Sequence, residues 1–313
     1  MINIYRTVEG KILEISEAQE GSWINMVNPT MEETIEMAKR YDIDLDDMRA
    51  ALDEEERPRI EVEDNYTLIL VDMPVIEERN EKDWYGTMPL GIIVTEDVIF
   101  TVCLEKSMVL GPFMNGRMRN FFTYKRTRFI LQILFKNATL FLDYLRIIDR
   151  KSEVIEKKLH ASTQNQELIE LLELEKSLVY FTTSLRTNEV VLEKMLKTES
   201  IKQYPEDAEL LEDVIVENKQ AIEMANIYSG ILSGMMDAFA SVISNNQNIV
   251  MKFLSVVTIV ISIPNIIFGA YGMNVNIKGM PLASSAFGFG AVILFAALLC
   301  VLAYLIFKKK KMF

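Results

Sequence analysis

The chain has 313 residues, of which 50% are hydrophobic, and its 33 basic and 45 acidic side chains give a formal net charge of −12. Six lysines and no acidic residue follow position 246, so residues 1–246 carry a net charge of −18, which argues against nucleic acid as a partner. Only two cysteines are present, which excludes a disulfide framework and is typical of a reducing compartment for the acidic part.

Residues 1–123 are predicted to form a small α+β domain with a sandwich-like α/β/α arrangement. A helix should follow Thr30, because Thr30 and Glu33 have the spacing of a capping box, and a second short helix covers residues 45–52. The order of the strands in the sheet does not follow from the sequence. Short β-rich runs occur at residues 2–7, 11–15, 23–27, 59–62, 66–73, 88–95 and 98–103.

No group of residues in the acidic part is typical of an enzyme or of a cofactor site. It has no glycine-rich phosphate loop, and the chain's one histidine, His160, lies in a charged helical stretch, where a surface imidazole is usually inert. The four consecutive acids at 53–56 point in different directions, so they indicate a solvated surface rather than a metal site. We expect neither catalysis nor a bound cofactor.

Residues 124–204 are predicted to form two long antiparallel helices. The first becomes heavily charged towards residue 159, and the second covers roughly residues 167–198. Such helices can pack on each other through their apolar faces and leave their charges in water. The apolar face of the second helix consists of Leu168, Leu171, Leu172, Leu178 and Leu185.

A third helix is predicted to begin after Pro205 and to continue to residue 273, as a stalk over 205–252 and a membrane span over 253–273. A helix of 68 residues is about 100 Å long, so no single globular core can bury it. It needs partners along its length, most simply copies of itself, which predicts a homo-oligomer. The inward contacts would be Val214, Ala221, Ala225, Leu232, Met235 and Phe239.

The span over 253–273 contains 21 consecutive uncharged residues, enough to cross a hydrocarbon layer of about 30 Å. Pro264 within it should leave the carbonyl near Val260 without a partner. One side of this helix carries a stripe of small and polar residues, which either packs against another helix or faces water in a pore; periodicity alone leaves both interpretations open. The stripe contains Asn248, Met251, Ser255, Thr258, Ser262, Asn265, Gly269 and Gly272.

A second span covers residues 286–307 and is apolar on all sides, which suits an outer helix facing lipid. Gly288 and Gly290 are expected to give points of close approach to the first span. Lys252 before the first span and the basic tail, 308–313, after the second predict that both chain ends are cytoplasmic. The protein is therefore expected in the cell (inner) membrane, in contact with lipid, with residues 274–285 forming an external loop.

The sequence Tyr271-Gly272-Met273-Asn274-Val275, between two spans and close to a lysine-rich end, resembles the CorA family of divalent-cation transporters. The resemblance covers the whole length: an acidic α+β part, long charged helices and two spans. In that family Gly-Met-Asn closes the first membrane helix, and five copies form a funnel that leads into the pore. The resemblance therefore implies a funnel-shaped homopentamer.

The resemblance also implies uptake of Mg²⁺, with Co²⁺ and Ni²⁺ as further substrates, driven by a membrane potential that contributes about 2 × 2.3 kcal/mol per 100 mV for a divalent ion. Gly272, Met273 and Asn274 would form the selectivity filter, where amide oxygens accept hydrogen bonds from the waters that Mg²⁺ retains. Met251 and Leu254 would form an apolar constriction. The pore-lining set is Asn248, Met251, Leu254, Ser255, Thr258, Ser262, Asn265 and Gly269.

The resemblance further implies that cytoplasmic Mg²⁺ regulates the pore by bridging acidic residues between subunits, so that Mg²⁺ is both substrate and regulatory ligand. The family's acidic stalk position falls on Asp213, and Glu209, Glu212 and Glu217 lie within one turn of it. The loop residues 276–282 contain one lysine and no acid, unlike many relatives, which leaves open a transporter for Zn²⁺ or another divalent cation. A non-conducting, membrane-anchored metal sensor or scaffold is the second alternative.

Overall fold

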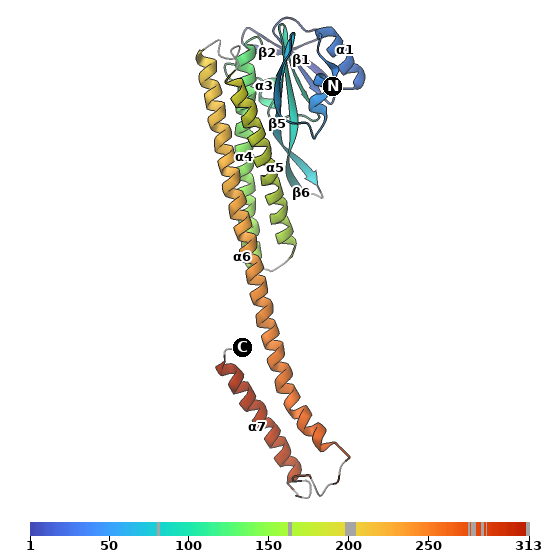
Figure 1. Cartoon of the computed structure of the whole chain (residues 1–313), viewed down its shortest axis with the longest axis vertical. Helices are drawn as coiled ribbons and strands as arrows, with labels where there is room; N and C mark the ends of the chain where they lie inside the picture. The colour runs from blue at the N-terminus through green and yellow to red at the C-terminus, as the bar shows by residue number, and fades with distance from the viewer. Residues whose placement is uncertain are drawn as a thin grey trace. The chain divides into compact units, whose positions relative to one another are not determined.

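The computed structural model divides the chain into two compact units, Met1–Met236 and Asp237–Phe313; the course of the chain through its elements is drawn in Figure 1. The predicted external loop and basic tail lie only partly within the residues that the structure describes, and Lys278 lies outside them. The described residues are 1–79, 82–161, 165–197, 205–274, 276, 280–282, 285 and 287–310.

A mixed sheet forms the centre of the first unit, with the strand order β2-β1-β3-β7-β6-β5-β4. β3 and β7 are parallel, and the other neighbouring pairs are antiparallel. Each strand predicted from the sequence is present. The strands are β1 (Ile2–Val8), β2 (Lys11–Ile15), β3 (Ser22–Val27), β4 (Arg59–Val62), β5 (Tyr66–Arg79), β6 (Lys82–Thr95) and β7 (Val98–Cys103).

β5 and β6 are longer than predicted, at 14 residues each. The sequence pattern ended β5 at residue 73 because Pro74 and the acids after it are unusual in a strand. In the sheet Pro74 lies opposite Thr87, and Pro89 lies opposite Asp72. Both prolines are beyond the ends of the β4 and β7 pairings, so each strand has a neighbour on one side only, and proline is tolerated at such edges.

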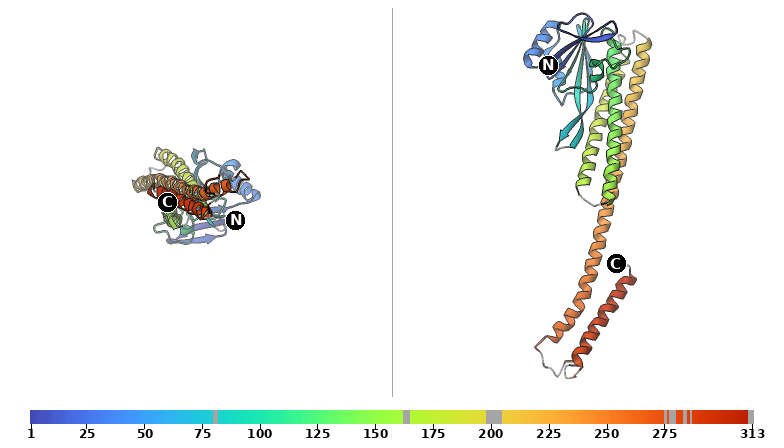
Figure 2. Two further views of the ribbon diagram at one scale, coloured as in Figure 1. Left: turned by 90° about the horizontal axis from the view of Figure 1, so that it is seen from below. Right: turned by 180° about the vertical axis from the view of Figure 1, so that it is seen from behind.

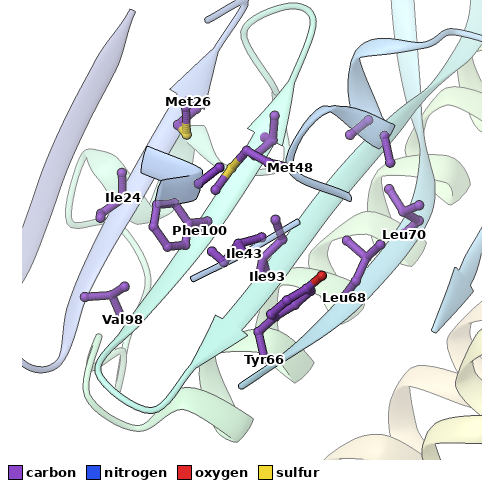
Figure 3. Close-up of a cluster of buried hydrophobic side chains, with 14 residues drawn as sticks. Ile24, Met26, Ile43, Met48, Tyr66, Leu68, Leu70, Ile93, Val98 and Phe100 are labelled. Atoms are coloured by element: carbon purple, nitrogen blue, oxygen red, sulfur yellow. The ribbon is translucent and has the colours of Figure 1, made fainter. Parts of the chain in front are cut away.

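One face of the sheet is covered by α1 (Met31–Tyr41), α2 (Leu45–Arg49) and the short 3-10 helix η1 (Ala50–Leu52). The predicted capping box is present, because the Glu33 N–H donates to the Thr30 hydroxyl and the Thr30 N–H donates to the Glu33 carboxylate. Figure 3 shows the core beneath these helices. Its buried side chains include Ile24, Met26, Met48, Leu68, Leu70, Ile93 and Phe100.

The other face of the sheet is covered by α4 (Arg126–Ala161) and α5 (Asn165–Met195), as Figures 1 and 2 show. Trp23 points to this face, where its indole Nε1–H donates to the Thr101 hydroxyl at 2.8 Å and its ring lies 5.1 Å from that of Phe129. The single turn α3 (Gly111–Met114), which the sequence analysis missed, adds Phe113 to the same aromatic cluster. With helices on both faces, the predicted α/β/α arrangement is confirmed.

The third long helix, α6 (Pro205–Tyr271), is present with bounds close to those predicted. Within the first unit it packs on its own chain: the Asn218 Nδ2–H donates to the Leu185 carbonyl of α5 at 3.0 Å. The prediction that its inward-facing apolar residues contact other copies is therefore wrong, because periodicity shows that a face is buried but not what buries it. Of the predicted set, Val214, Ala221, Ala225, Leu232 and Phe239 are already buried in one chain, and Met235 is half-buried.

The second unit contains the C-terminal part of α6 and α7 (Gly288–Lys309). Both helices are long and apolar enough to cross a membrane, judged by length and composition. Val256 of α6 and Ala296 of α7 are buried, so the two helices pack together here. The expected role of the α7 glycines is wrong: a Cβ on Gly288 would clash with the Leu282 carbonyl of the connecting segment, and one on Gly290 would meet no described atom within 4 Å.

Candidate ion pathway

The Gly-Met-Asn sequence lies at the C-terminal end of α6. The helix ends at Tyr271, after which the Gly272 N–H donates to the Phe268 carbonyl at 2.9 Å. The Tyr271 hydroxyl donates to the Pro281 carbonyl at 2.7 Å and so ties the connecting segment back to the helix end. The Asn274 side chain is exposed and makes no hydrogen bond within the described part of the chain, so its amide is available to an external partner.

The predicted polar stripe faces away from α7. The α6 residues that α7 covers, Val256, Val260, Ile263 and Ile267, are buried or half-buried and recur on one side of the helix. At about 100° per residue, the centre of the stripe lies roughly 160° around the helix from this side. The stripe positions are exposed, apart from a half-buried Ser262. Packing against α7 of the same chain therefore does not account for the stripe.

The hydroxyl groups of the stripe are satisfied within α6 itself. Ser255, Thr258 and Ser262 each donate to the carbonyl four residues earlier, at 2.7, 2.8 and 2.7 Å. The amides of Asn248 and Asn265 have no such partner among the described residues. Because an unsatisfied amide is costly against lipid, Asn265 in particular calls for water or another chain next to it.

The four acids predicted to bind regulatory metal lie on α6 in the first unit. Glu209, Glu212 and Asp213 are exposed, and Glu217 is half-buried. Within the described residues, no three His, Cys, Asp or Glu side chains are close enough to hold a metal ion. The regulatory role of these four acids therefore stays a prediction.

Cys300, one of the two cysteines of the chain, has no role in the sequence analysis. In the structure its Sγ lies 3.5 Å from the Val260 carbonyl oxygen, the carbonyl expected to lose its partner at Pro264. Pro264 indicates in the sequence that the carbonyl four residues earlier needs another donor. The sequence does not show which α7 side chain lies opposite that carbonyl.

The sequence and the fold of this chain are similar to those of known proteins. A family model described as CorA-like Mg²⁺ transporter protein matches residues 18–309. The chain belongs to this family. Family members are transporters rather than enzymes, which confirms the class predicted from the sequence.

Two curated CorA proteins illustrate the similarity. The cobalt/magnesium transport protein CorA of Methanocaldococcus jannaschii is 30% identical over 312 residues, which cover 96% of this chain and 95% of that protein. The cobalt/magnesium transport protein CorA of Thermotoga maritima is 22% identical, with 96% and 86% covered.

The fold agrees with that of a solved CorA structure. The complete structure of the CorA magnesium transporter from M. jannaschii matches with a TM-score of 0.85 at 25% identity, covering 100% of this chain and 99% of that one. The predicted architecture, an α+β domain followed by long helices and two C-terminal spans, is confirmed.

Proposed function

We propose that this protein is a channel-like transporter that takes up Mg²⁺ through a pore lined by α6 from several copies of the chain. The observation that carries the proposal is the uncovered side of α6. It bears the Asn265 amide, which has no partner in the described chain, and it leads to the free amide of Asn274, while α7 covers the opposite side. A water-filled passage between copies would satisfy these amides.

The chemistry of the stripe suits a hydrated divalent ion. Mg²⁺ dehydrates reluctantly and is usually bound with several waters retained. Amide oxygens at Asn265 and Asn274 can accept hydrogen bonds from those waters, and an uncharged path does not trap the ion. Met251 and Leu254, both exposed on α6, supply an apolar segment at the cytoplasmic end where a narrow pore would exclude water.

Assembly and orientation are part of the proposal. Five copies are proposed because the family resemblance implies a pentamer. Lys252 and the four lysines at 308–311, around the end of α7, favour a cytoplasmic location for both ends in the cell membrane. Five copies of residues 1–246, with a net charge of −18 each, would repel one another. Cytoplasmic Mg²⁺ bound between chains at Asp213 and its neighbours would offset this repulsion and favour closure.

The test is cation flux into liposomes that contain only the purified full-length protein, with Mg²⁺, Co²⁺, Ni²⁺ and Zn²⁺ supplied singly. Inward Mg²⁺ flux that increases with an inside-negative potential supports the proposal. Zn²⁺ flux without Mg²⁺ flux would favour a Zn²⁺ transporter. This alternative is considered because residues 276–282 contain no acid. No flux of any ion, together with cation binding, would favour a sensor. A measured mass in detergent that corresponds only to a monomer or a dimer would exclude a pore formed by several copies.

A further inference from the structure

Pro264 creates a polar defect in the middle of the proposed pore helix. Proline has no N–H, so the Val260 carbonyl lacks the donor that residue 264 would otherwise supply. An unpaired carbonyl within the hydrocarbon region is costly, and neighbouring side chains commonly satisfy such groups in membrane helices. In this chain the nearby donor is the Cys300 thiol of α7, 3.5 Å from the Val260 oxygen.

The hydroxyl donors of this part of α6 are already used within the helix, and the Asn265 amide lies on the side that α7 leaves uncovered. Ser255, Thr258 and Ser262 donate to the carbonyls of Met251, Leu254 and Thr258. Cys300 lies one turn after the buried Ala296, on the side of α7 that packs against α6. The contact therefore joins the outer helix to the one turn of α6 that cannot complete its own hydrogen bonds.

We propose that Cys300 is a positioning residue for transport: its thiol holds the turn formed by residues 260–264 against α7 and so fixes the direction in which α6 continues towards Asn274. This inference rests on the proposed function. The helix extends seven residues beyond Pro264, about 10 Å, so a swing of about 5° at this turn displaces its end by roughly 1 Å. Displacements of this size are enough to weaken a preorganised site.

The first test is a double-mutant cycle on Mg²⁺ flux in proteoliposomes of the full chain. Cys300→Ala should lower the flux about two- to tenfold, the range expected for one lost hydrogen bond, while Cys300→Ser keeps a donor and should restore it. In a Pro264→Ala background the backbone N–H gained at position 264 can bond to the Val260 carbonyl, so Cys300→Ala should have no further effect. Leu298→Ala, on the exposed side of α7, is the matched control and should leave the flux unchanged.

A second measurement reads the contact without transport. The infrared S–H stretching band of Cys300, isolated as the difference between wild type and Cys300→Ala, should be shifted by hydrogen bonding, and Pro264→Ala should return it to the position of a free thiol. The inference is overturned if the Cys300→Ala protein transports Mg²⁺ as fast as wild type. It is also overturned if the S–H band of Cys300 has the same position in Pro264→Ala as in wild type. Failure of the proposed function is distinct, because the wild-type vesicles would then carry no divalent flux at all.

Discussion

The Asn188 side chain of α5 completes the backbone hydrogen bonding of β5 at Asp72. Its Oδ1 accepts from the Asp72 N–H and its Nδ2 donates to the Asp72 carbonyl, both at 2.8 Å, and that carbonyl also accepts from Asn137 Nδ2. The pairing of β4 with β5 ends at Leu70, so the amide acts in place of a neighbouring strand at this edge. Asn188 is only 3% exposed, which means that water does not replace it readily.

Asn188→Leu keeps a similar volume and removes both bonds. The Asp72 N–H is left buried without an acceptor, which costs about 1–3 kcal/mol, while the carbonyl keeps its bond from Asn137 and should cost little. For a unit of this size, about 2 kcal/mol corresponds to a melting temperature lowered by roughly 4–8 °C. Asn188→Asp should destabilise more, because it places a buried carboxylate oxygen against the Asp72 carbonyl.

The assay is thermal unfolding of the full-length protein in detergent, with tryptophan fluorescence as the signal for unfolding. The two tryptophans, Trp23 and Trp84, both lie in the first unit, so the signal reports on that unit even though the membrane helices are present. Thr183→Ala on the same helix, whose exposed hydroxyl bonds only to its own helix, is the matched control and should change the melting temperature little. An Asn188→Leu protein that melts like this control would refute the reasoning.

Three further predictions concern the filter, the regulatory acids and a buried thiol. Asn274→Ala should leave assembly intact but abolish selective Mg²⁺ uptake, whereas Asn274→Asp should bind the ion more tightly and release it more slowly; wild-type flux in Asn274→Ala would contradict the filter assignment. Asp213→Lys should make closure less dependent on Mg²⁺ and weaken protection from proteolysis by Mg²⁺; unchanged protection would place the sensor elsewhere. Burial raises the pKa of the Cys103 thiol to about 12, so at pH 8 it stays protonated and should resist alkylation until the first unit unfolds; rapid labelling of Cys103 in the native protein would contradict this.

Much of the fold followed from local patterns. The capping box at Thr30 and Glu33, the alternation in the strands and the uninterrupted pattern after Pro205 each depend on residues close in sequence, and each was confirmed. The misses required knowledge of distant neighbours. The second half of β5 was missed because Pro74 is acceptable only where the strand has a neighbour on one side, and α3 because a helix of four residues has no detectable period.

The candidate site was predicted in part for the same reason. Asn274 and the polar stripe were recognised from the motif and the spacing, but the sequence could not show which side of α6 faces α7. The structure shows that the side of α6 with Val256 and Val260 faces α7. It also shows that Cys300 lies opposite the Val260 carbonyl. Membership of the transporter family does not test the individual pore residues, so their roles stay predictions.

The faces of α6 also limit where a second copy can pack. Buried positions such as Ala221, Ala225 and Leu232 recur on the side that packs against the helix's own chain. The opposite side carries small and polar residues, including Gly230 and Gly234, whose added Cβ atoms would meet no described atom within 4 Å. Between these sides lies a third line with the exposed apolar residues Ile227 and Ile231, which are 53% and 48% exposed. Exposed apolar side chains on one side of a helix favour a protein partner over water, so in the proposed assembly we expect copies to meet along this line.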